Sequence, residues 1–318
     1  MSMIDRIDPE SRIPLDALNA ALPGGFNAIA DLATRRATLD GMLQMMTADI
    51  PPNPNVILED SLIPGPAGAP DIPIRIYRPV SPAASKPGIL FIHGGGMVLG
   101  NLESDHLSAV AICELTGSVL VSVDYRLAPE NPAPAAIEDC YAALRWMHAA
   151  SSELGFDSTR LAVYGGSAGG GLAIATALVA RDRGTPIISF LMTPYPMIDD
   201  RNETESSKAV VDLGIWDRAG NIECWEWYLG GQSADQYSAP ARATDLSNLP
   251  PMFIDVGDCD MFLDEDTAFV NKVRADGGTV EFIVYPGAYH ASEVFAPAAA
   301  LSATISGRRI EALKAALA

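Results

Sequence analysis

Beyond residue 55, the hydrophobic positions follow two patterns that take turns along the chain. Residues 56–61 and 72–77 alternate apolar and polar side chains on either side of Pro64-Gly65-Pro66, which predicts an antiparallel pair of strands. Residues 88–92 are continuously apolar, as in a strand buried on both faces. Short apolar runs then alternate with stretches of helical spacing, and this repetition predicts an α/β fold: a mostly parallel sheet with helices on both faces. We expect further strands at 119–123, 161–164, 187–192, 252–256 and 280–285, and helices at 107–115, 135–150, 172–183, 265–275 and 297–317.

Two stretches do not follow this alternation. Residues 1–50 carry apolar side chains at helical spacing and predict two or three short amphipathic helices. Residues 197–249 begin with a polar run, continue with aromatic residues and include a helix of their own. We therefore predict a main α/β domain over 51–318, in which an insertion at about 197–249 joins the N-terminal segment 1–50 to form a small helical cap.

The composition narrows the classes of partner. The 318 residues carry a net charge of −19 and only four lysines, a balance that repels phosphate backbones and anionic lipid surfaces. We expect no nucleic-acid binding, and neutral small molecules suit this charge better than anions. No apolar run approaches the ~18 residues of a membrane span, and the first residues do not resemble a signal peptide. We therefore expect a cytoplasmic protein without membrane insertion, and leave open whether it forms a homodimer.

The cysteines and histidines do not form a metal-binding pattern. Cys113, Cys140, Cys224 and Cys259 are widely spaced and have no histidine at ligand distance in the sequence. This spacing predicts four buried free thiols rather than a disulfide framework or a metal site. We expect no metal and no cofactor.

A strand, a sharp turn and a small-residue helix meet at Gly165-Gly166-Ser167-Ala168-Gly169. A serine on such a turn is the nucleophile elbow, and glycines two residues before and after it leave room for the strained backbone. The following helix directs its N-terminal N–H groups at the serine. A chance G-x-S-x-G is expected in about one chain in ten of this length, given usual glycine and serine frequencies. The motif therefore needs support from other residues.

A glycine loop follows the buried strand that ends at residue 92. It reads His93-Gly94-Gly95-Gly96, a run whose chance occurrence is on the order of one in several hundred chains. Glycines let backbone N–H groups turn toward a neighbouring reaction centre without side chains in the way. No lysine follows in the register of a phosphate-binding loop, so an N–H donor loop is the better interpretation.

Only one histidine stands where a base for Ser167 is needed. His93 belongs to the glycine loop, and His106 and His148 lie in helical runs before the serine. His290 follows the serine and the last expected strand, as the order Ser, acid, His of this fold requires.

The acidic partner is less distinct in the sequence. Residues 255–266 contain six carboxylates, most of which we expect to be solvated or to lie at a helix N-terminus. Asp255 lies inside a predicted strand. Asp258 and Asp260 both lie in the loop after it, where either could reach His290.

With these motifs, the chain resembles the bacterial hormone-sensitive lipase family, the HGGG-type carboxylesterases of the α/β-hydrolase fold. The resemblance extends over about residues 55–300, with two departures: Gly166 stands where the family commonly has Asp, Glu or Thr, and the family's Asp-Pro-Leu is Asp-Met-Phe at Asp260. The matching motifs, in the family's order, are His93-Gly-Gly-Gly96, Asp124-Tyr-Arg-Leu-Ala-Pro-Glu130, Gly165-Gly-Ser-Ala-Gly-Gly170, Asp199-Asp-Arg201 with Thr204 and Ser206, Gly257-x-x-Asp260 with Asp264-Glu265, and Gly287-x-x-His290.

The resemblance implies specific roles. Asp260 would be the acid, 30 residues before His290 as in the family. The oxyanion hole would be formed by the N–H groups of Gly95, Gly96 and Ala168.

Together, the residues and the resemblance predict a serine carboxylesterase. Ser167 would attack the carbonyl of a short- to medium-chain acyl ester and form an acyl-enzyme, with His290 as base and Asp260 orienting it. Lactones or thioesters would use the same site. The alternative from another class is a non-catalytic small-molecule binding protein, as in the plant gibberellin receptors. Those resemble the family but lack the catalytic histidine, and His290 argues against that alternative.

Overall fold

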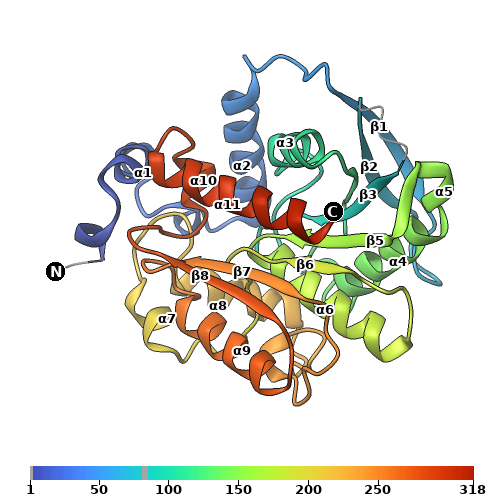
Figure 1. Ribbon diagram of the computed structural model, residues 1–318. Coiled ribbons are helices and arrows are strands. Elements are labelled where there is room, and N and C mark those ends of the chain that lie inside the picture. Colours follow the sequence, from blue (N-terminus) through green and yellow to red (C-terminus); the bar gives the residue numbers. More distant parts are fainter. Residues whose placement is uncertain (1–2, 81–84) are drawn as a thin grey trace.

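One eight-stranded sheet forms the centre of the computed structural model, which describes residues 3–80 and 85–318 (Figure 1). The strand order is β1-β2-β4-β3-β5-β6-β7-β8. β1 pairs antiparallel with β2, β2 pairs antiparallel with β4, and all other neighbours are parallel, so the predicted fold class and the predicted antiparallel pair are confirmed. The strands are β1 (Val56–Ile63), β2 (Ile72–Pro79), β3 (Lys86–Ile92), β4 (Val119–Val123), β5 (Phe156–Gly165), β6 (Phe190–Met192), β7 (Met252–Gly257) and β8 (Val280–Tyr285).

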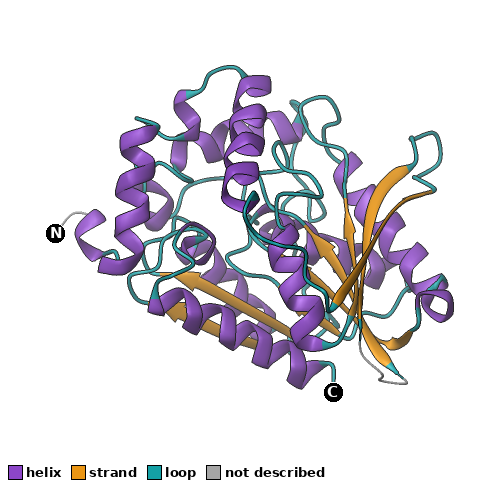
Figure 2. Cartoon of the chain, turned by 90° about the horizontal axis from the view of Figure 1, so that it is seen from above, coloured by secondary structure: helices purple, strands orange, loops and turns teal. Residues whose placement is uncertain are grey.

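Helices cover both faces of this sheet (Figure 2). Alternate residues of β3 point to opposite faces, and they join two separate buried clusters. One cluster contains side chains of α4, α6 and α9, and the other contains side chains of α3 and α11. The α-helices are α1 (Pro9–Ala21), α2 (Leu32–Thr47), α3 (His106–Thr116), α4 (Ala135–Ala149), α5 (Ser151–Leu154), α6 (Ala168–Arg183), α7 (Glu205–Ala209), α8 (Arg218–Leu229), α9 (Leu263–Ala275), α10 (Ser292–Phe295) and α11 (Ala300–Ala316). Three short 3-10 helices complete the described elements, η1 (Ile4–Arg6), η2 (Phe26–Ala28) and η3 (Pro240–Arg242).

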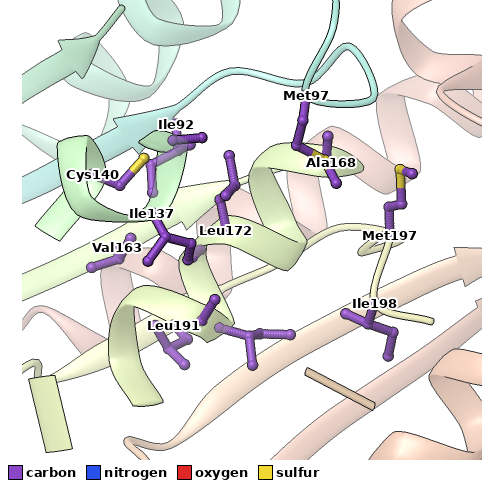
Figure 3. Packing of buried hydrophobic residues seen from close by; sticks show 14 of the residues in the cluster. Ile92, Met97, Ile137, Cys140, Val163, Ala168, Leu172, Leu191, Met197 and Ile198 are labelled. Atoms are coloured by element: carbon purple, nitrogen blue, oxygen red, sulfur yellow. The ribbon is translucent and has the colours of Figure 1, made fainter. Parts of the chain in front are cut away.

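Helix α6 begins at Ala168, four residues earlier than the apolar spacing predicted. Its first turn contains three glycines, and they allow the helix to pack directly on neighbouring backbone. Figure 3 shows Ala168 and Leu172 of this helix within the buried cluster that also contains Ile92. A Cβ on Gly169 would lie 2.1 Å from the Ile92 carbonyl oxygen, and one on Gly171 would lie 2.1 Å from that of Met197. The glycine run therefore brings the start of α6 against the end of β3.

Strand β6 is shorter than expected, Phe190–Met192 rather than 187–192. Ile187 is 83% exposed, so the first part of this apolar run lies outside the sheet. The four cysteines are buried and unpaired, as predicted.

The N-terminal segment and the insertion contact each other. Arg35 of α2 forms an ion pair with Glu223 of α8 at 2.7 Å, and the Asn27 amide donates to Asp217 at 2.6 Å. Helix α1 packs on α10 and on α11, the last helix of the chain (Figure 1). Within residues 3–80 and 85–318, no helix is both long and apolar enough to cross a membrane.

The packing of α6 gives a prediction on stability. Gly171→Ala should lower the free energy of unfolding by about 1–3 kcal/mol, because its Cβ would overlap the Met197 carbonyl. Gly307→Ala is the matched control, since Gly307 lies in α11 and a Cβ placed on it would have no atom within 4 Å. It should raise the free energy of unfolding by about 0.5–1 kcal/mol. Denaturant titration of both variants measures the difference, and two effects of the same sign would contradict the packing described.

Candidate active site

Ser167 lies at the tip of the turn between β5 and α6. Its backbone has φ 56° and ψ −122°, a conformation that costs a non-glycine residue about 1–3 kcal/mol. Neighbouring backbone holds it there: the Ser167 N–H donates to the Pro194 carbonyl at 3.0 Å, and its carbonyl accepts from Gly171 N–H at 3.0 Å. A Cβ on Gly165 would lie 2.2 Å from the Gly169 carbonyl oxygen. The two motif glycines are thus required by the close approach of strand and helix.

The imidazole of His290 lies between Ser167 and Asp260. Nε2 is 2.9 Å from Ser167 Oγ, and Nδ1 is 2.8 Å from Asp260 Oδ2. Because a carboxylate only accepts, Nδ1 carries the proton and Nε2 is free to accept the serine hydroxyl hydrogen. Asp260 Oδ1 accepts from the Phe262 N–H at 3.0 Å, which fixes the carboxylate. The structure brings together all three side chains that the sequence singled out, from the ends of β5, β7 and β8.

Asp258, the other candidate acid, points elsewhere. Its carboxylate accepts from the Arg6 guanidinium at 2.9 Å and from the Gly287 N–H at 2.7 Å. It therefore ties the N-terminal segment to the loop before His290 without contacting the imidazole.

We expected most carboxylates of residues 255–266 to be solvated or to lie at a helix N-terminus. Asp264, Glu265 and Asp266 do lie in the first turn of α9, but Glu265 and Asp266 are buried, as are Asp255 and Asp260. Burial raises the pKa of Glu265 and of Asp266 well above the ordinary range, and neighbouring carboxylates add to the effect. Neither oxygen of the Asp266 carboxyl has a hydrogen-bond partner among the described residues.

The glycine loop presents backbone N–H groups beside the serine. The Gly94 N–H donates to Asp105 at 3.2 Å, and Leu99 N–H donates to the Gly95 carbonyl at 2.8 Å, which closes the loop. By contrast, the N–H groups of Gly95, Gly96 and Ala168 donate to no atom of the described residues. A Cβ on Gly94 would lie 3.7 Å from the Ser167 Cβ, so loop and serine are adjacent. These N–H groups suit an anion formed next to Ser167.

His93 anchors this loop. Its ring stacks on Tyr125 with centroids 4.2 Å apart, and its Nδ1 donates to the Gly94 carbonyl at 2.8 Å. Burial lowers the pKa of His93 to about 4, so the ring is neutral near pH 7. This histidine fixes the glycines and does not contact the serine.

Three aromatic rings surround His290, and no sequence motif pointed to any of them. Tyr195 and Phe262 approach the imidazole edge-on, with ring centroids at 4.8 and 5.1 Å. Trp216 of the insertion lies at 6.2 Å. The aromatic residues of the insertion could have indicated that some of them line the site. The sequence pattern did not show which ring does so.

A buried ion cluster lies behind Tyr195. Arg309 of α11 binds Asp255 through two hydrogen bonds of 2.7 and 2.8 Å and also pairs with Glu293. Glu293 accepts in addition from the Tyr195 hydroxyl. Burial acts to raise the pKa of Glu293, but Arg309 and the hydrogen bonds outweigh it and keep that pKa below its ordinary value. The Arg309 guanidinium thus links β7, which precedes Asp260, to the turn after His290. Through Glu293 it also holds the Tyr195 ring beside His290.

Among the described residues, no group of three or more His, Cys, Asp or Glu side chains could hold a metal ion. The groups gathered at Ser167 are those of acyl transfer: a hydroxyl, a base with its carboxylate, and backbone donors.

Comparison with known proteins agrees with this chemistry. A family model described as the alpha/beta hydrolase fold matches residues 89–294. The chain belongs to the α/β-hydrolase family. This α/β-hydrolase is 35% identical to the carboxylesterase NlhH of Mycobacterium tuberculosis, over 98% of this chain and 96% of that protein. It is 30% identical to an ethyl acetate hydrolase of Pseudomonas putida, over 69% of this chain and 70% of that one.

Solved structures give the same result. A bacterial heroin esterase matches with a TM-score of 0.93 and 37% identity, over all of both chains. The α/β-hydrolase is therefore a carboxylesterase of the hormone-sensitive lipase type, a serine ester hydrolase as the motifs predicted. A non-catalytic binding protein is not favoured.

The buried Asp266 gives a prediction on pH. Its pKa is raised in the folded state, so its contribution to stability is complete below the unfolded value of about 3.9 and is lost as the pH rises toward the folded pKa. The Asp266→Asn variant has no ionisable group at this position, so its stability does not fall with pH for this reason. Its free energy of unfolding should equal that of the wild type near pH 4 and exceed it by more than about 1 kcal/mol at pH 8, since a tenfold change in proton affinity is worth about 1.4 kcal/mol.

Denaturant titrations from pH 4 to pH 8 measure this difference. Asp212→Asn, a change at an exposed carboxylate, serves as the control and should follow the wild-type curve. Wild-type and Asp266→Asn curves that stay parallel over this range would contradict the assignment.

Proposed function

We propose that Ser167, His290 and Asp260 are the catalytic residues of this carboxylesterase. The observation that carries the proposal is the bridging imidazole, within 2.9 Å of Ser167 Oγ on one side and 2.8 Å of Asp260 on the other. His290 removes the hydroxyl proton as Ser167 Oγ attacks the acyl carbonyl carbon. Asp260 keeps the proton on Nδ1 and stabilises the imidazolium that forms.

The N–H groups of Gly95, Gly96 and Ala168 would bind the oxyanion of the tetrahedral intermediate. Their lack of other acceptors supports this role, and one such donor is typically worth about 10²–10³ in rate. As the intermediate collapses, His290 gives its proton to the departing alcohol oxygen and the acyl group stays on Ser167. Water then attacks the acyl-enzyme with His290 again as base, and the acid product leaves.

The substrates that fit best are neutral esters of short- to medium-chain acids. One relative is named an ethyl acetate hydrolase, which acts on a short acyl ester. Ser167 is 8% exposed and His290 4%, so the site is enclosed. The net charge of −19 favours neutral over anionic substrates. Lactones and thioesters could react at the same groups.

We also propose that residues 1–50 and 197–249 form a cap over the site. The Arg35–Glu223 and Asn27–Asp217 contacts support one unit made of both segments. Arg36 of α2 donates to the carbonyl of Val98, directly after the glycine loop. A cytoplasmic location stays a prediction from the sequence, and the sequence leaves open whether the chain forms a homodimer.

Two variants test the assignment of the nucleophile and the acid. Ser167→Ala should abolish hydrolysis of p-nitrophenyl acetate and labelling by a fluorophosphonate probe, because both reactions need the hydroxyl. Asp260→Asn should lower kcat by about 10⁴, since the imidazole loses its orienting carboxylate. Steady-state kinetics and intact-mass analysis of the probe adduct measure these effects.

Asp258→Asn is the matched control, two residues away in the same loop. It removes an ion pair with Arg6, whose side chain is 41% exposed, so kcat should fall by less than about tenfold. A greater loss at Asp258 than at Asp260, with both variants folded, would show that the wrong carboxylate was assigned.

A further inference from the structure

The Trp216 side chain lies between the glycine loop and His290. A Cβ built on Gly96 would lie 2.3 Å from Cη2 of Trp216, so the six-membered ring rests against the backbone of this glycine. The same side chain has its ring centroid 6.2 Å from that of His290, at 37°. Gly96 is a proposed oxyanion donor and His290 the proposed base. Ser167 is 2.9 Å from His290 Nε2 and adjacent to Gly94 of the same glycine loop. The indole therefore borders the position that a bound ester must occupy.

Buried hydrogen bonds hold the indole in place. Nε1 donates to Asn221 Oδ1 at 3.0 Å, and the Asn221 amide donates in turn to Asn202 Oδ1. Asn202 is 3% exposed with φ 55°, and its carbonyl accepts from Arg218. Rotating the indole away would leave the buried Oδ1 of Asn221 without its donor, which is costly in an interior of low dielectric constant. The ring is thus a fixed wall.

The other sides of the imidazole are already occupied. Tyr195 and Phe262 pack edge-on against His290, and Tyr195 is anchored by Glu293. A substituent of the ester that extends toward the insertion meets Trp216.

We propose that Trp216 sets the size limit of the substrate, admitting only a small group on one side of the reacting carbonyl. The proposal rests on the catalytic assignment above and deepens it. The part of the ester that meets Trp216 is either the acyl chain or the alcohol. In both cases the space admits an unbranched or flat apolar group. Replacing the indole by a smaller side chain opens space of hydrocarbon size next to Gly96. One methylene fitted into an apolar pocket changes kcat/KM by about 10- to 200-fold.

A graded series tests the size limit: Trp216→Phe, Trp216→Leu and Trp216→Ala. Each variant is assayed with p-nitrophenyl acetate, butyrate and octanoate, which vary the acyl group. It is also assayed with ethyl, butyl and benzyl acetate, which vary the alcohol. In one of the two arms, the ratio of kcat/KM for the largest to the smallest ester should rise at least about tenfold for Trp216→Ala. The rise should follow the order Phe, Leu, Ala, and the arm that responds identifies the restricted group.

Trp227→Ala is the matched control, a tryptophan of α8 that stacks on Arg35 with the guanidinium carbon 5.5 Å from the ring centroid. Its size ratios should stay within about twofold of the wild type. A purely structural Trp216 would lower kcat/KM for all esters by one factor, and ratios unchanged in both arms would overturn the proposal. If Trp216→Ala does not fold, Trp216→Phe and Trp216→Leu decide by the same ratios.

The result is independent of the test of the nucleophile. Loss of turnover in Ser167→Ala concerns the catalytic assignment, whereas the Trp216 series is read from ratios between esters that the enzyme still hydrolyses. Folded Trp216→Phe and Trp216→Ala that both lose p-nitrophenyl acetate hydrolysis would also overturn the proposal, because a wall residue is not needed for the smallest ester.

Discussion

The structure depends on one backbone constraint, the left-handed turn at Ser167. An L-residue adopts φ 56° only when its surroundings hold it there. Here the sheet, the glycine run of α6 and the Pro194 carbonyl all do so. Because the turn is held, the Ser167 hydroxyl lies 2.9 Å from His290 Nε2, and α6 begins at the next residue. The other groups of the site are arranged around this fixed point.

The loops after three parallel strands then meet at one edge of the sheet. β3 is followed by the glycine loop, β7 by the loop of Asp260, and β8 by the turn of His290. Side chains that follow parallel strands gather at their carboxyl ends, which is where sites of open α/β sheets lie. Strand order and short connections therefore place Ser167, Asp260 and His290 at the same edge of the sheet.

Much of this arrangement could be predicted from the sequence because it depends on local patterns. Apolar runs indicated the strands, the glycines on both sides of Ser167 indicated the turn, and the position of His290 after the last strand indicated the base. From the residues alone, Asp258 and Asp260 were equally good candidates for the acid that orients His290. The difference between them arises from Arg6 and Gly287, contacts that no local pattern shows. Burial of Asp266 and the place of Trp216 likewise depend on how distant elements pack.

Arg309 follows every strand of the sheet in the sequence, yet it joins the strand before Asp260 to the turn after His290. During synthesis, the emerging polypeptide can pair most of its strands before this guanidinium has left the ribosome. Until then Asp255 and Glu293 have no cation between them. These two buried carboxylates therefore gain their shared cation only after every strand of the sheet has been made.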